Sequence, residues 1–294
     1  MELLDYLAQN NTAFTITSLI LGLMVGSFLN VVIHRLPRML EQEWRAQCAD
    51  FLDQAQDPAA TEKYNLVTPD SHCPHCGHKI RAWENIPVLS YIFLRGRCSH
   101  CQGKISIRYP IIELVTGVLT AACAWHFGYG LPAVAAMLLT WCLICLTMID
   151  FDHKLLPDII TLPVLWLGML LNLRNTYTDI ESSILGATVG YLVLWLLYHA
   201  FRILTGKEGM GYGDFKLLAL LGAWMGWQYL LPIVLLSSLV GALVGITLIV
   251  AMGRDRQIPI PFGPYLASAG WITLFWGKDI IAWYMGFSGL ASPA

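Results

Sequence analysis

Charged residues are scarce in this chain. Only 13% of its 294 residues are Asp, Glu, Lys or Arg, against about 25% in an ordinary soluble domain. Hydrophobic residues make up 56%, and the mean hydropathy is +0.57. This composition excludes an ordinary soluble globule and predicts a polytopic membrane protein. The sequence also lacks the basic clusters typical of nucleic-acid binding, so no nucleic-acid partner is expected.

Several sequence signatures of other enzyme classes are missing as well. No His-Glu-x-x-His motif of a zinc protease occurs, and no nucleophile elbow or other Ser/His/Asp arrangement is evident. The N-terminus, MELLDYLAQNNT, is acidic and polar rather than basic. It therefore lacks the positive segment of a cleavable signal peptide, and we expect the first apolar run to remain as a membrane anchor.

Apolar runs that alternate with short polar loops fill most of the chain. About 17–25 apolar residues span a bilayer as a helix. Eight spans are predicted, at residues 12–33, 110–127, 131–149, 156–173, 183–203, 215–227, 229–252 and 261–284. The sixth is short, and its length is left open. The predicted fold is an all-α polytopic membrane protein with about eight transmembrane helices.

The distribution of basic residues predicts the orientation. All of the 18 lysines and arginines except Arg174 and Lys278 fall in the loops of one face. Because positive loops remain in the cytoplasm, that face is expected to be cytoplasmic and both termini periplasmic. Three pairs of glycines four residues apart predict close helix contacts: Gly22/Gly26, Gly186/Gly190 and Gly241/Gly245.

The one long polar stretch, residues 34–109, is predicted to form a domain between a first helix (1–33) and a membrane bundle (110–294). Its first part, residues 41–66, has the pattern of a short amphipathic helix and a loop. Its second part carries two similar segments, CPHCGHKI (73–80) and CSHCQGKI (98–105). The domain therefore resembles a small cytoplasmic zinc ribbon inserted after the first helix.

Four of the eight cysteines form these two Cys-x-x-Cys pairs: Cys73, Cys76, Cys98 and Cys101. Four thiolates satisfy tetrahedral zinc and leave no coordination position for water, so a structural zinc ion is predicted. Disulfides are the weaker alternative, because the cytoplasm is reducing. The histidines around the pairs could replace one thiolate: His72, His75, His78 and His100.

Few acidic residues lie in or beside the apolar runs. Asp150 continues directly from the third span, and Asp152 is about 200° further round that helix. Asp158 and Asp214 could each begin a helix, a common role for Asp. Asp214, however, lies in GMGYGDFKLL, where Gly211 and Gly213 are expected to permit close backbone approach and positive φ. The dinucleotide interpretation of these glycines fails, because no strand precedes them.

Asp150 and Asp214 are predicted to meet at the same membrane face. Two carboxylates that lie close together share a proton, because they cannot both ionise cheaply. The ionised carboxylate can then take a proton from water while the protonated one polarises a scissile carbonyl. The pair predicts peptide hydrolysis without a covalent intermediate.

Together with the two cysteine segments, six further motifs resemble those of the bacterial prepilin peptidases, which are Gly-x-Gly-Asp aspartic proteases. They are GSFLNVVIHRLP (26–37), WENIPVLSY (83–91), RGRC (95–98), IRYPIIE (107–113), MIDFDHKLLPD (148–158) and GMGYGDFKLL (209–218). The resemblance covers nearly the whole chain. It implies an inner-membrane enzyme that removes the leader of type IV prepilins and type II secretion pseudopilins after a glycine. The new N-terminal residue is then methylated from S-adenosylmethionine.

By the same resemblance, Asp150 and Asp214 are the catalytic pair. Gly96, in RGRC (95–98), matches a family position linked to methyl transfer, and Glu84 and Arg108 are weaker candidates for that site. No S-adenosylmethionine motif is recognisable in the sequence itself. The methyltransferase activity therefore depends on the resemblance, supported by the presence of all four cysteines.

The sequence leaves three alternatives. The first is a peptidase without methyltransferase activity, which the intact cysteine pairs argue against. The second is a proton-coupled transporter with a zinc-ribbon docking domain, since membrane acids often relay protons. The third is a presenilin-like protease, in which Tyr precedes the first catalytic Asp; here Ile149 precedes Asp150.

Overall fold

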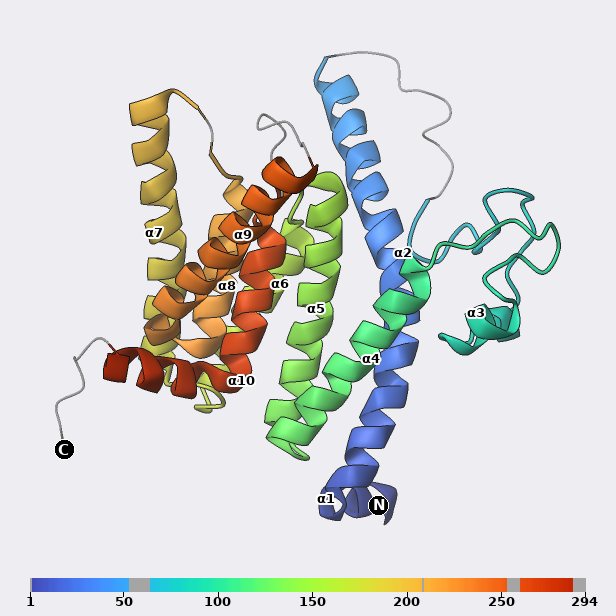
Figure 1. Ribbon diagram of the computed structural model, residues 1–294, viewed down its shortest axis with the longest axis horizontal. Helices are drawn as coiled ribbons and strands as arrows, with labels where there is room; N and C mark the ends of the chain where they lie inside the picture. The colour runs from blue at the N-terminus through green and yellow to red at the C-terminus, as the bar shows by residue number, and fades with distance from the viewer. Residues whose placement is uncertain (1, 53–63, 208, 253–259, 288–294) are drawn as a thin grey trace. The chain divides into compact units, whose positions relative to one another are not determined.

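The computed structural model describes residues 2–52, 64–207, 209–252 and 260–287 of the chain. Its α-helices are α1 (Glu2–Gln9), α2 (Asn11–Phe51), α3 (Leu89–Phe93), α4 (Arg108–Phe127), α5 (Leu131–His153), α6 (Asp158–Asn172), α7 (Ile180–Thr205), α8 (Tyr212–Met225), α9 (Leu230–Met252) and α10 (Gly263–Phe287). Two 3₁₀ turns, η2 (Ala82–Asn85) and η3 (Trp227–Tyr229), complete the described elements. Within these ranges only two isolated β-bridges occur, so the predicted all-α fold is confirmed (Figure 1).

Each of the eight predicted spans coincides with a helix. Among the described residues, five helical segments are long and apolar enough to cross a membrane. Four are α2, α4, α5 and α7, and the fifth joins η3 to α9. Of the other three, α6 has 15 residues and α8 has 14. The helix α10 is longer but bends at Trp276, whose φ of −121° is not helical. The chain is therefore a multi-pass membrane protein, and its sixth predicted span is indeed short.

The first membrane helix is longer than predicted. α2 continues without interruption for 41 residues and contains Pro37. At 1.5 Å per residue it is about 60 Å long, twice the hydrocarbon thickness of a bilayer. The amphipathic helix expected after residue 41 is therefore the outer part of α2, and residues 53–63 of the expected loop lie outside the described residues. The division at residues 33 and 109 remains a prediction.

The chain divides into two compact units, residues 1–141 and 142–294. In the first unit, α2 packs lengthwise against α4. A Cβ atom on Gly26 would lie 2.7 Å from the Glu113 Cα, and one on Gly22 would lie 2.6 Å from the Thr120 Oγ1. Only glycine permits this approach, so the predicted close contact is confirmed at this pair.

The second unit is built around α8, which packs against α6, α7 and α10 (Figure 1). Its residues from Phe215 to Met225 are almost all buried, in keeping with a helix that is apolar on every side. Gly186 of α7 and Gly222 of α8 touch backbone to backbone, so this predicted glycine contact is confirmed too.

The far end of α8 is closed by side chains of its neighbours. The Asn172 amide donates to the carbonyls of Ala223 (2.9 Å) and Trp224 (3.0 Å), and the Ser183 hydroxyl donates to Ala223 as well (2.5 Å). The last carbonyls of a helix have no intrahelical partner and are costly to bury unbonded. These side chains allow α8 to end inside the protein, which explains how so short a helix fits a membrane bundle.

Candidate active site and metal centre

Asp150 and Asp214 lie together within the second unit. Asp150 is in the last turn of α5, and Asp214 is the third residue of α8. Their residues are only 5% and 6% exposed, and the two carboxylates are close enough for their charges to interact. Asp214 Oδ2 accepts a hydrogen bond from the Gly211 N–H (3.2 Å), whereas Asp150 Oδ2 is buried without a hydrogen-bond partner among the described residues. The predicted juxtaposition is present.

A third element reaches this pair. Gly263, the first residue of α10, lies directly against Asp150, because a Cβ atom there would be 2.5 Å from Oδ2. Leu156, just after α5, fills the space between α8 and α10. A Cβ on Gly213 would meet Leu156 Cβ at 2.7 Å, and a Cβ on Gly263 would meet Leu156 Cδ1 at 3.3 Å. Asp150 therefore lies against a glycine of α10, and Leu156 packs against glycines of both α8 and α10.

The roles of the glycines differ partly from the prediction. Gly211 has φ −86°, and Gly213 lies within α8, so neither has the expected positive φ. Close approach, the other expected role, is present at Gly213. The expectation of positive φ was wrong because Gly211 is an extended residue before a helix, a conformation open to any amino acid.

The neighbouring acids have other surroundings. Asp152 is exposed on α5, as predicted from its direction. Asp158 begins α6 and pairs with Lys216 of α8, whose Nζ lies 2.7 Å from both carboxylate oxygens. Because Lys216 follows Asp214 by two residues, this ion pair ties the start of α8 to the start of α6.

The cysteine pairs form two knuckles of one design. In the first, the Cys73 N–H donates to His78 O (2.9 Å) and the Gly77 N–H donates to Cys73 O (2.9 Å). The equivalent bonds of the second knuckle join Cys98 with Gly103 (2.9 Å) and Gln102 with Cys98 (3.1 Å). Gly77 and Gln102, at the same position of each turn, both have positive φ.

The four cysteine sulfurs fit a metal ion. They all lie within 4.8 Å of one another, and the Cys73 and Cys101 sulfurs are 3.8 Å apart. Thiolates around tetrahedral zinc, with Zn–S bonds of 2.3 Å, are also about 3.8 Å apart. Backbone N–H groups of His75 and Cys76 lower the pKa of the Cys73 thiol, which favours the thiolate that a metal requires. At Cys76 the backbone N–H of His78 is outweighed by burial and by the other three thiols, so the pKa of that thiol is raised instead. The cluster can therefore bind a metal.

The three residues considered for the methyl donor have structural contacts. Gly96 has φ +68°, and a Cβ there would lie 2.8 Å from the Tyr91 hydroxyl. The Glu84 side chain is 6% exposed, accepts the Arg81 N–H (2.8 Å) and lies 3.7 Å from His78 Nε2. The backbone N–H of Arg81 holds the pKa of Glu84 below its usual range. Arg108 is partly exposed at the first turn of α4. Gly96 and Glu84 thus shape the cysteine domain.

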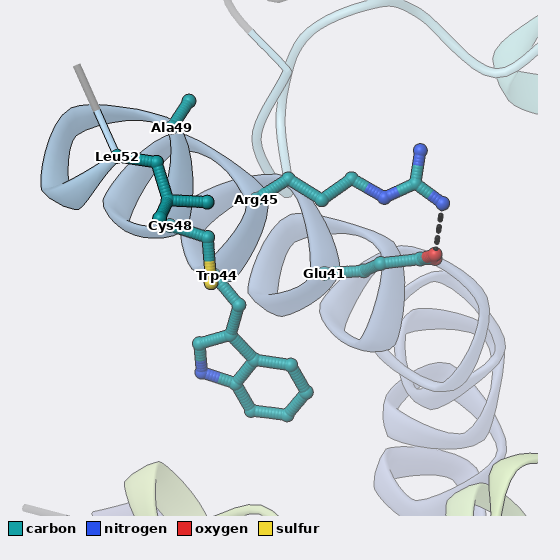
Figure 2. A pocket seen from close by; sticks show the side chains of 6 residues that line it. All are labelled: Glu41, Trp44, Arg45, Cys48, Ala49 and Leu52. Atoms are coloured by element: carbon teal, nitrogen blue, oxygen red, sulfur yellow. Dashed lines mark hydrogen bonds and ion pairs between the residues drawn. The ribbon is translucent and has the colours of Figure 1, made fainter. Parts of the chain in front are cut away.

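A shallow hollow on α2 is a further candidate site. It encloses about 330 Å³ and is lined by Glu41, Trp44, Arg45, Cys48, Ala49 and Leu52 (Figure 2). The Arg45–Glu41 ion pair (2.6 Å) closes one side. Five of the six residues belong to α2, and the sixth, Leu52, is the residue that caps its C-terminal end. A hollow on the side of one helix lacks the enclosing walls of a ligand site.

Two family models match the chain. Residues 20–127 match the bacterial peptidase A24 N-terminal domain, and residues 137–246 match the type IV leader peptidase family. A relative from Stutzerimonas stutzeri, named prepilin leader peptidase/N-methyltransferase, is 53% identical over 99% of this chain and 100% of its own length. The chain belongs to the type IV leader peptidase family. This membership favours the peptidase interpretation over the transporter.

Other members of the type IV leader peptidase family carry the same name. A relative from Pseudomonas aeruginosa is 52% identical over 98% of this chain and 99% of its own length. One from Aeromonas hydrophila is 56% identical over 90% of this chain and 91% of its own length. No solved structure matches the chain.

Some residues of the site were not predicted from the sequence. Gly263 and Leu156 have no charge or reactive group, and their position beside Asp150 depends on the packing of α8 and α10. A weak signal for Gly263 was available in the Pro-Phe-Gly-Pro run (261–264), because prolines and glycine at a helix start often mark a close turn. The pairing of Lys216 with Asp158 had no signal beyond opposite charge.

Proposed function

We propose that this chain is a bifunctional membrane enzyme. It removes the leader peptide of type IV prepilins, and of type II secretion pseudopilins, by cutting after a glycine. It then methylates the new N-terminal amine. The observation that carries the proposal is the pair of buried carboxylates, Asp150 and Asp214, with the unpartnered Asp150 oxygen beside the start of α10.

Asp150 and Asp214 would act as an acid–base pair. Two buried carboxylates whose charges interact share one proton. The ionised carboxylate takes a proton from water as the water oxygen bonds to the scissile carbonyl carbon, and the protonated carboxylate gives its proton to the carbonyl oxygen. The C–N bond then breaks, and a proton passes to the leaving nitrogen. The products are a leader with a carboxylate end and a mature protein with a free amine.

Burial of the two carboxylates assists the reaction. Burial strengthens the interaction between the carboxylates and excludes competing water. The cost of burying them is offset in part by the Gly211 N–H, which donates to Asp214 Oδ2, and the close packing of Gly263 limits the movement of Asp150. An extended peptide backbone would supply the partner that Asp150 Oδ2 lacks.

The methyltransferase half depends on the family and on the intact cysteine domain. S-adenosylmethionine would supply the methyl group that the new amine receives. Gly96, Glu84 and Arg108 remain the proposed residues for this site, with Gly96 and Glu84 acting by shaping the domain. The four cysteines would hold a structural zinc ion, because their donor set leaves no open position for chemistry.

The expected location is the bacterial inner membrane, with the cysteine domain and the aspartates on the cytoplasmic side and both termini in the periplasm. The basic residues of the loops support this orientation. It also suits the substrate, whose basic leader remains inside while its apolar helix lies in the membrane. The exposed apolar faces of the helices would contact lipid.

The decisive assay incubates the purified protein with a prepilin and S-adenosylmethionine, and follows the product by mass spectrometry. The expected product is a mature pilin with one N-terminal methyl group. An uncleaved prepilin would contradict the peptidase half, and a cleaved but unmethylated pilin would contradict the methyltransferase half.

A further inference from the structure

An apolar segment of the cysteine domain, residues 83–93, has no protein cover over much of its surface. Its exposed side chains are Trp83 (53%), Ile86 (46%), Leu89 (52%), Ile92 (62%) and Phe93 (81%). The only charged residue between Arg81 and Arg95 is Glu84. The Glu84 side chain is turned inward and is 6% exposed. The segment thus presents an apolar surface without a charge.

Two contacts attach this segment to the membrane helices of its own unit. The Val88 N–H donates to Glu113 Oε2 of α4 (2.8 Å), and the Ser27 hydroxyl of α2 donates to Asn85 Oδ1 (3.4 Å). Val88 has φ +60°, a conformation that β-branched residues rarely adopt. In Figure 1, α3 lies beside the first turns of α4 rather than beyond its end.

The position of these contacts along the helices gives their depth. Arg35 marks the polar end of the membrane part of α2, because it donates to the carbonyls of Asn65 (3.0 Å) and Pro69 (2.6 Å) in the polar loop. Ser27 precedes Arg35 by eight residues, or about 12 Å. Glu113 follows Arg108 by five residues, or about 7.5 Å along α4.

These distances of about 12 Å and about 7.5 Å are as long as the headgroup layer is thick, or longer. The layer accounts for about 5–8 Å on each side of a 30 Å hydrocarbon core. If Arg35 and Arg108 are at the polar surface, Ser27 and Glu113 are at or below the headgroups. Asn85 and Val88, which are bonded to Ser27 and Glu113, are then at the same depth.

We propose that residues 83–93 dip into the bilayer and contact lipid acyl chains directly. The flanking Arg81 and Arg95 are exposed, which suits contact with anionic headgroups on either side of an apolar insertion. The occupant of this surface is thus a phospholipid bilayer. The insertion fixes the height of the cysteine domain, because knuckle residues precede and follow the segment in the chain.

The chain offers a closely matched control position. Val67 is 81% exposed, the same as Phe93, and is also apolar. It lies between Asn65 and Pro69, the residues bonded by Arg35, and is therefore at the polar end of the unit. The two positions differ in expected depth and not in exposure or chemical class.

The test places the photoreactive residue p-benzoylphenylalanine at Phe93 or at Val67 in the full-length protein. Each variant is reconstituted in vesicles of phosphatidylethanolamine and phosphatidylglycerol, irradiated and analysed by mass spectrometry. A several-fold excess of phospholipid adducts at position 93 is expected. Equal lipid yields at the two positions, or capture of a second protein copy in place of lipid at 93, would overturn the proposal.

A second pair of variants tests the attachment to α4. With the probe at position 93, Glu113→Gln retains an oxygen that can accept the Val88 N–H, whereas Glu113→Ala does not. Lipid adducts should persist in the first variant and fall several-fold in the second, with metal content equal in both as a check on folding of the cysteine domain. Unchanged adduct yields in Glu113→Ala would refute the assigned anchor. Peptidase activity does not enter either readout, so the outcome is independent of the proposed function.

Discussion

The cysteine domain and the aspartate site differ in whether their buried polar side-chain atoms have hydrogen-bond partners. Among the described residues of 64–107, each buried side-chain oxygen or nitrogen has a partner, and the four thiols face one another. In the second unit, by contrast, the buried Asp150 Oδ2 and Thr273 Oγ1 have none among the described residues. Buried polar groups are normally satisfied, and exceptions concentrate at sites of function. At the aspartate site the unsatisfied oxygen belongs to an ionisable group beside a second acid, whereas the described side chains of the cysteine domain satisfy one another.

The largest expected effect comes from the aspartates. Asp150→Asn and Asp214→Asn each remove a group that must gain or lose a proton, so cleavage should fall by at least about 10²–10⁴-fold. Cleavage of a purified prepilin by variant protein in vesicles is the measurement. Asp152→Asn, on the same helix but exposed, is the control and should keep most activity. Substantial cleavage by Asp150→Asn would exclude that residue from the pair.

The next largest effect is expected at the four-cysteine cluster, where the proposed metal site stabilises the cysteine domain. Cys73→Ser replaces a buried ligand, so the variant should lose its metal and become sensitive to protease between residues 72 and 108. Metal analysis and limited proteolysis measure the two changes. Cys48→Ser, an exposed cysteine outside the cluster, is the matched control. Undiminished zinc content in Cys73→Ser would refute the four-thiolate site.

A smaller but specific loss is expected at Gly263. In Gly263→Ala the new methyl group would press on Asp150 Oδ2, and a misplacement of about 1 Å can cost up to about 10²-fold in rate. The turnover number should fall while helix content is unchanged. Gly286→Ala, where a Cβ meets no atom within 4 Å, is the control. Equal rates for the two variants would show that α10 does not position the carboxylate.

The smallest effect is expected at the ion pair between α6 and α8. The side chains of Lys216 and Asp158 are 28% and 52% exposed, and such exposed pairs contribute about 0–1 kcal/mol. Lys216→Met should therefore slow cleavage only a few-fold, and the exchange Asp158→Lys with Lys216→Asp should recover part of that loss. A loss as deep as that of Asp214→Asn would place Lys216 in the catalytic machinery instead.

Much of the architecture follows from the sequence because a bilayer permits few choices. Every apolar run must satisfy its own backbone, so each of the eight runs forms a helix. Cys73, Cys76, Cys98 and Cys101 come together because the two knuckles repeat one turn. Asp150 and Asp214 were predicted as a pair because charged groups in apolar runs are rare and require partners.

What could not be predicted depends on contacts between distant segments. Local patterns do not reveal that Gly263 abuts Asp150, that Val88 takes a positive φ beside Glu113, or that α8 ends against Asn172. The continuation of α2 to Phe51 was also missed, because the change from apolar to polar residues after 33 marks the membrane surface and not the end of a helix. The positive φ expected near Asp214 failed because close approach alone accounts for Gly213.

The most direct test of the division between the two regions uses the Asp150→Asn variant with two substrates. One is an intact prepilin, and the other is a synthetic mature pilin peptide with a free N-terminal amine, both supplied with S-adenosylmethionine. Mass spectrometry should find the prepilin uncleaved and the peptide methylated at the wild-type rate. Loss of both reactions from this single substitution would contradict the account, because it would mean that the two regions do not perform separate tasks.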